Sequence, residues 1–79
     1  MGRTATPEPF AVEFGARVRR HRQAREWTQE QLAEAAAMHW TYVGSVERGE
    51  RNISLHNILR LASALGLDAS DLLRGLRLD

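Results

Sequence analysis

Apolar residues recur along this chain at intervals of three and four positions, which is the spacing of one face of an α-helix. Between residues 10 and 26 this interval joins Phe14 to Val18. No stretch alternates apolar and polar residues with the period of two expected of a half-buried strand. The pattern therefore predicts an all-α protein, and it is clearest in the segment that contains Leu55, Ile58, Leu61, Ala62 and Leu65.

Residues that commonly begin and end helices divide the rest of the chain into elements. Thr28 followed by Gln31 is the sequence signature of a capping box, and it predicts a helix that runs to about Ala36. Ser54 is expected to cap a later helix. The full expectation is five helices: residues 10–26, 28–36, 40–48 closed by Gly49, 55–65 closed by Gly66, and a short helix between Asp68 and Gly75.

The two short helices over 28–36 and 40–48 are separated only by a tight turn at Ala37 and Met38. Ala33 is small where two steeply crossing helices leave little room, and Val43 and Val46 share one face that packs inward. A short helix held in this way can offer its other face to the major groove of DNA. The sequence thus predicts a helix-turn-helix DNA reader, whose exposed face carries His39, Trp40, Thr41, Gly44 and Ser45.

Length and charge fit one small DNA-binding domain. The 79 residues have a net charge of +1, yet five arginines lie between residues 17 and 25, and such a basic cluster suits a phosphate backbone. We expect a flexible arm over residues 1–9, a helix-turn-helix domain over 10–75 and a tail over 76–79. There is no apolar run of the roughly 20 residues that span a membrane and no signal-peptide core, so a cytoplasmic location is the expectation.

Catalysis and cofactor binding are not indicated by the residues present. The chain has no cysteine, and its histidines His21, His39 and His56 are too scattered for a metal site. No arrangement of a nucleophile with a base and no glycine-rich phosphate loop is present. We therefore expect neither an enzyme nor a cofactor, and no small-molecule effector is evident.

Three motifs carry a resemblance that covers residues 14–73: WTQEQLAEAA, then TYVGSVERGERNISLHNILRLASALGL, then DASDLL. With these motifs in this order, the chain resembles the lambda-repressor/Cro superfamily, also called the xenobiotic-response-element family. It is most similar to the small members that include restriction-modification controller proteins. The resemblance implies a five-helix, lambda-repressor-like domain with its helix-turn-helix at the second and third helices. It also implies a homodimer that binds a partly palindromic DNA operator.

The same resemblance implies roles for individual residues. Arg22 and Glu47 match an ion pair that joins the first helix to the third. Trp40, Thr41 and Ser45 match base-reading positions, and Gly44 would allow close approach of DNA. The candidates for phosphate contacts are Gln29, His39, Tyr42, Arg48, Arg51 and Asn52.

Two residues depart from the family pattern. Ala37 occupies a corner where glycine is common, and Trp40 stands where an arginine often reads guanine. Tryptophan cannot form the bidentate contact to guanine, so contact with a thymine methyl group or a sugar, or insertion at a flexible step, is the alternative. Partial burial or contact with a protein partner is the other interpretation of Trp40.

The expected function is that of a sequence-specific transcriptional regulator that acts as a homodimer and controls its own gene. Leu67, Leu72 and Leu76 exceed what a short last helix needs to bury, and they are candidates for the dimer interface. RNA polymerase and a protein encoded nearby are further candidate partners. The alternative is an antitoxin-like or adaptor module that mainly binds another protein, with Trp40 and the leucine-rich C-terminus as its surface.

Overall fold

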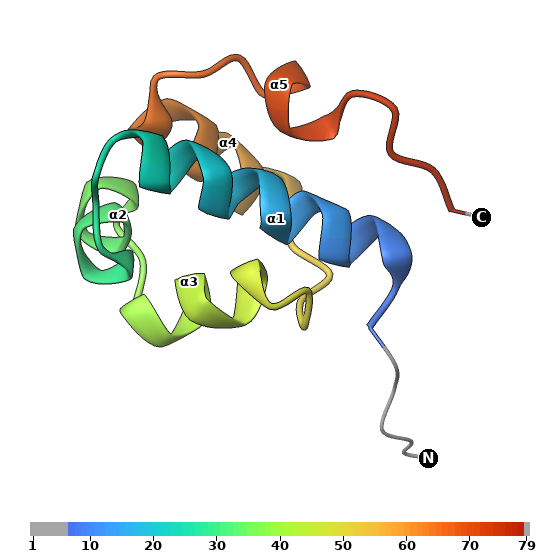
Figure 1. Ribbon diagram of the computed structural model, residues 1–79, viewed down its shortest axis with the longest axis horizontal. Coiled ribbons are helices and arrows are strands. Elements are labelled where there is room, and N and C mark those ends of the chain that lie inside the picture. Colours follow the sequence, from blue (N-terminus) through green and yellow to red (C-terminus); the bar gives the residue numbers. More distant parts are fainter. Residues whose placement is uncertain (1–6, 79) are drawn as a thin grey trace.

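The computed structural model describes residues 7–78, and in that range the chain forms five helices and no strand (Figure 1). The predicted all-α architecture is confirmed. The first helix begins at Pro9 and ends two residues earlier than expected, and the last is a single turn. Most of the predicted arm lies outside the described residues. The helices are α1 (Pro9–Ala24), α2 (Gln29–Ala36), α3 (Trp40–Glu47), α4 (Leu55–Leu65) and α5 (Ser70–Leu73).

Local capping fixes the helix boundaries where the sequence predicts them. The Thr28 hydroxyl accepts a hydrogen bond from the Gln31 backbone N–H at 3.1 Å, and the Gln31 side chain accepts one from the Thr28 N–H at 2.7 Å. This is the reciprocal capping box expected at the start of α2. Ser54 caps α4 through the Asn57 N–H at 3.2 Å, and Gly66 ends that helix in the left-handed conformation.

The corner between α2 and α3 depends on a left-handed alanine. Ala37 has φ +58° and ψ +49°, a conformation that costs an L-residue roughly 1–2 kcal/mol. The Met38 N–H donates to the Ala33 carbonyl at 2.9 Å and closes the turn. Arg60 of α4 donates to the Ala37 carbonyl at 3.3 Å, so a third helix helps to hold the strained corner.

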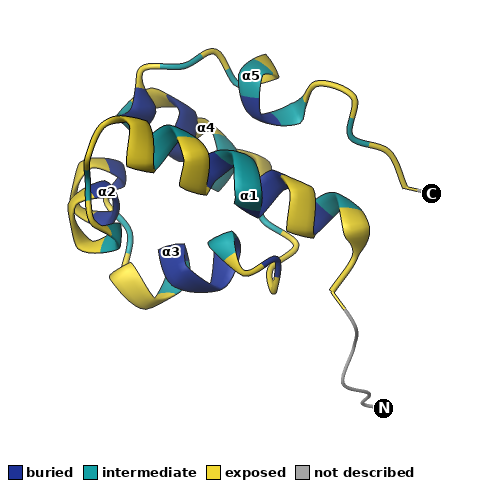
Figure 2. Ribbon diagram, viewed as in Figure 1, coloured by how far each residue is buried: buried dark blue, intermediate teal, exposed yellow. Residues whose placement is uncertain are grey.

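The core lies where α1 meets the other helices. Phe14 and Val18 contribute the inward face of α1, as predicted, and pack with Val43 of α3 and Leu61 of α4. Figure 2 shows buried segments on α1, α3, α4 and α5, in dark blue. Leu72 of α5 is fully buried in the same cluster. Its expected place in a dimer interface is therefore wrong, because α1 already covers the single turn of α5.

Gly15 marks a close approach between α1 and α3. A Cβ atom at this position would overlap the Val46 carbonyl oxygen and would lie 2.8 Å from the Glu47 carbonyl oxygen. Both are backbone atoms of α3, so neither can rotate away. The absence of a side chain at residue 15 therefore sets the distance between the two helices.

We predict that Gly15→Ala destabilises the protein by about 2–3 kcal/mol through this overlap, measured by thermal or urea unfolding. Helix propensity alone would make the same change stabilising by about 1 kcal/mol. The sign of the change thus separates the two effects, and a variant that unfolds at or above the wild-type midpoint would disprove the close-packing argument.

Candidate nucleic-acid interface

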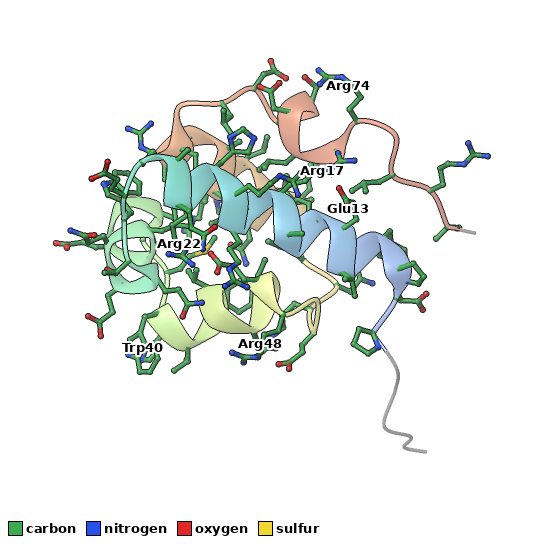
Figure 3. All side chains as sticks on the ribbon, viewed as in Figure 1. Glu13, Arg17, Arg22, Trp40, Arg48 and Arg74 are labelled. Carbon is green, nitrogen blue, oxygen red and sulfur yellow. The ribbon has the colours of Figure 1, made fainter. Side chains whose placement is uncertain are left out.

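The first turn of α3 projects from the body of the protein. Trp40 is 49% exposed, and His39 and Thr41 beside it are also exposed. Trp40 extends outward at the start of α3 (Figure 3). The His39 ring nitrogen Nδ1 accepts a hydrogen bond from the Thr41 backbone N–H at 3.2 Å and caps the helix. The exposed tryptophan therefore sits on a helix start that is held in place.

The remainder of α3 is covered, contrary to the sequence expectation for two residues. Gly44 and Ser45 are buried, so their placement on the exposed face is wrong. A Cβ atom on Gly44 would lie 3.2 Å from Nη1 of Arg48 and 3.3 Å from Oε1 of Gln29. Helical periodicity did not reveal this cover, because it is supplied by side chains from α2 and from the end of α3.

Ser45 also has partners for its hydroxyl within the protein. The hydroxyl donates to the Tyr42 carbonyl at 2.7 Å and accepts from Nε of Arg51 at 3.0 Å. The Arg51 guanidinium lies over the Tyr42 ring, 5.1 Å from its centroid. Asn57 of α4 donates to the Tyr42 hydroxyl at 3.2 Å. Ser45 and Tyr42 thus hold Arg51 beside α3, and Asn57 is a supporting residue that the sequence analysis missed.

Arg22 and Glu47 form the predicted ion pair between α1 and α3. Nε of Arg22 donates to Glu47 at 2.7 Å and Nη2 donates at 3.0 Å, so the contact is bidentate. The two side chains are only 12% and 3% exposed. Hydrogen bonding to the carboxylate raises the pKa of Arg22 above its usual value, against the opposing effect of burial. The guanidinium also donates to the Trp27 carbonyl at 2.8 Å.

Gln29 joins this pair from the start of α2. Its side-chain amide donates to the same Glu47 carboxylate at 3.1 Å. The Gln29 side chain thereby links α2 to α3, a role that the sequence analysis did not assign. Its expected role at a phosphate stays a prediction, and the groups of α2 that are oriented for that role are the backbone N–H groups of its first turn.

The turn after α3 carries the remaining phosphate candidates. Arg48 and Arg51 are exposed here, as is Asn52. Nε and Nη2 of Arg48 donate to the two carboxylate oxygens of Glu50 at 3.0 and 3.2 Å. This contact raises the pKa of Arg48 and lowers the pKa of Glu50. Sequence analysis overlooked Glu50, although an acid between two arginines was visible there.

Residues 7–78 contain no group of three or more metal-ligating side chains. No helix in the same range is long and apolar enough to cross a membrane. The start of α3 and the arginines that follow it are exposed and carry an aromatic ring and two guanidinium groups.

Comparisons with known proteins agree with this architecture. A family model described as a helix-turn-helix domain matches residues 13–77. The chain therefore belongs to the helix-turn-helix family. Its five-helix arrangement is that of lambda-repressor-like proteins, as expected from the sequence motifs.

Controller proteins are among the most similar relatives. Control protein C.SmaI of Serratia marcescens is 48% identical over 56 residues, which are 71% of this chain and 67% of the relative. Control protein C.BamHI of Bacillus amyloliquefaciens is 44% identical over 61 residues, 76% of this chain and 75% of the relative. The crystal structure of the restriction-modification controller protein C.AhdI from Aeromonas hydrophila superposes with a TM-score of 0.77 at 48% identity, covering 78% of this chain and 94% of that one.

These similarities, together with the fold, define a DNA-binding transcriptional regulator of the controller-protein type. The predictions of family, fold class and regulatory function are confirmed at this level. The relatives are named as control proteins rather than as enzymes, which agrees with the expectation of a non-enzymatic protein.

We predict that Glu47→Ala lowers the free energy of unfolding by about 3 kcal/mol, because it leaves the Arg22 guanidinium buried without its counter-charge. Glu13→Ala is the matched control. It removes a half-exposed carboxylate that pairs with Arg17 at 2.9 Å on the surface of α1, and its melting temperature should stay close to that of the wild type. Equal melting temperatures for the two variants would show that the buried pair does not brace the fold.

Proposed function

We propose that this protein binds a partly palindromic DNA operator as a homodimer, with the first turn of α3 of each protomer in the major groove. The observation that carries the proposal is the exposed pair Trp40 and Thr41 on a capped helix start, followed by Arg48 and Arg51 at the other end of the same helix. An exposed tip with the free N–H groups of the α2 start on one side and two arginines on the other is suited to a groove bordered by two phosphate strands.

Base recognition is assigned to Trp40 and Thr41 in this proposal. The tryptophan ring offers an apolar surface to a thymine methyl group or a deoxyribose, and the threonine can contact a base edge through its hydroxyl or methyl group. Ser45 and Gly44 are left out because they are buried. With few base-reading side chains, the shape and stiffness of the DNA between the half-sites supply part of the specificity.

Phosphate contacts position the helix. We assign them to the first turn of α2 at Gln29, where free backbone N–H groups and the helix dipole favour an anion. His39 borders the groove on the same side. Tyr42 of α3 and the turn after that helix supply the opposite set, which comprises Tyr42, Arg48, Arg51 and Asn52.

We assign dimerisation to the C-terminal segment, but without Leu72, because that side chain is buried within the protomer. Leu67 and Leu76 are half-buried, and Leu78 is 84% exposed. A two-fold contact through this segment would bury leucines that a single protomer leaves in water. Half-site centres would then lie about one DNA turn apart, roughly 34 Å.

Leu78→Asp should shift the protein from dimer to monomer in analytical ultracentrifugation, because the charge would enter an apolar contact. Leu55→Asp is the control, since Leu55 is another exposed leucine, at 67%, on α4. Dissociation caused by Leu55→Asp and not by Leu78→Asp would move the interface to α4. A monomeric wild type would disprove the stable dimer.

The regulatory proposal is tested by fluorescence anisotropy with the DNA upstream of the protein's own gene, at about 150 mM salt because the affinity depends strongly on it. Tight binding that survives a scrambled competitor is the expected result and would support control of its own gene. Weak binding to every sequence, together with stable purification alongside another protein, would instead favour the adaptor function.

Trp40→Ala should reduce binding to the specific site and leave the weak, salt-dependent binding to random DNA unchanged. The reason is that the tryptophan carries no charge and is assigned to the bases alone. The ratio of the two affinities is the measured quantity. Wild-type affinity for the specific site in the Trp40→Ala variant would exclude Trp40 from recognition.

A further inference from the structure

The Arg48–Glu50 pair occupies the turn that the proposed function places against phosphate. Two of the three guanidinium nitrogens of Arg48 donate to the carboxylate, at 3.0 and 3.2 Å. This is the fork geometry that arginine otherwise offers to a phosphate group. The third nitrogen, Nη1, lies over Gly44. A phosphate that binds Arg48 through its fork must therefore displace Glu50.

Glu50 also lies beside the second arginine of this turn. The positive charge of Arg51 contributes to the lowered pKa of Glu50, after the larger effects of Arg48. The Glu50 carboxylate therefore stays charged at pH values below its usual titration range. At neutral pH its negative charge offsets the positive charge of both arginines that we assign to phosphate. Arg51 itself is held elsewhere, through Nε on Ser45 and over the Tyr42 ring. Only Arg48 donates both of its fork nitrogens to the acid.

We propose that Glu50 is a specificity-determining residue that holds Arg48 away from DNA until the recognition helix is seated on its site. This inference rests on the proposed function. In a loose complex with random DNA, a nearby phosphate is not placed well enough to displace Glu50, so Arg48 stays with the carboxylate, although it would contact that phosphate if Glu50 were absent. In the specific complex, close docking of α3 brings a phosphate within reach, and Arg48 exchanges one anion for the other.

The exposure of the pair makes this exchange easy. The Arg48 and Glu50 side chains are 60% and 50% exposed, and ion pairs in such surroundings are weak and screened by salt. By contrast, the Arg22–Glu47 pair is almost fully buried and holds the fold together. The C-terminal end of α3 thus contributes to two different arginine–glutamate pairs. The pair through Glu47 is fixed, and the pair through Arg48 can exchange its partner.

The test compares Glu50→Gln with Glu13→Gln. Each variant removes one negative charge that is paired with arginine on the surface, so both have the same net charge. Glu13 lies on the α5 side of α1, whereas Arg48 lies below α3 (Figure 3). Affinity is measured by anisotropy between about 50 and 200 mM salt, with a short duplex of random sequence and with a duplex selected from a random pool by the wild-type protein.

Glu50→Gln should bind the random duplex about fivefold more tightly than the wild type, and its salt slope should steepen by about 0.9, the value of one additional phosphate contact. Affinity for the selected duplex should rise less, so the specificity ratio falls. Glu13→Gln should match the wild type on both duplexes. Equal behaviour of the two variants, or an unchanged ratio for Glu50→Gln, would overturn the inference.

An Arg48→Ala background shows whether Glu50 acts through Arg48. There, Glu50→Gln should have little further effect on the random duplex, and an undiminished effect would overturn the claim that Glu50 works by holding that arginine. Failure of the wild type to select any duplex would reject the proposed function itself. Selection by the wild type combined with an unchanged specificity ratio would reject only the role of Glu50.

Discussion

The carboxylate of Glu47 is the point on which the placement of the recognition helix depends. It is the last residue of α3, its side chain is 3% exposed, and it accepts hydrogen bonds from Arg22 of α1 and Gln29 of α2. A buried carboxylate is costly unless such donors are present. Because each donor comes from a different helix, satisfying this one charge fixes α3 relative to both of its neighbours.

The absence of a side chain at Gly15 makes that arrangement possible. Residues 15 and 22 are seven positions apart and share a face of α1. At Gly15 the backbones of α1 and α3 meet directly, and two turns later Arg22 reaches Glu47 across the same interface. A wider separation at residue 15 would move the guanidinium away from the carboxylate. Close packing and charge pairing are thus two parts of one contact.

Much of this fold could be predicted from local sequence signals. The capping box at Thr28, the Ser54 cap and the left-handed Gly66 act within a few residues, so the sequence alone locates them. The burial of Ser45 and Leu72 could not be predicted from helical periodicity, because it depends on residues outside their own helices: Arg51 reaches back six residues to Ser45, and α1, far away in the sequence, covers Leu72. The Arg22–Glu47 pair was predictable only through the resemblance to a family.

The structure leaves this regulator a narrow surface with which to read DNA. Only the first turn of α3 is exposed, because Gln29 and Arg48 cover Gly44 and the Ser45 hydroxyl is bonded within the protein (Figure 2). Two side chains, Trp40 and Thr41, are those we propose to read bases, and they offer less direct base discrimination than a full helix face would. A protein with so little direct readout gains most from limiting its attraction to phosphate alone, since that attraction is the same on every sequence. An acid placed between the two arginines that we assign to the DNA backbone would act in this direction. This gives a physical reason for the position of Glu50, which the fold itself does not require.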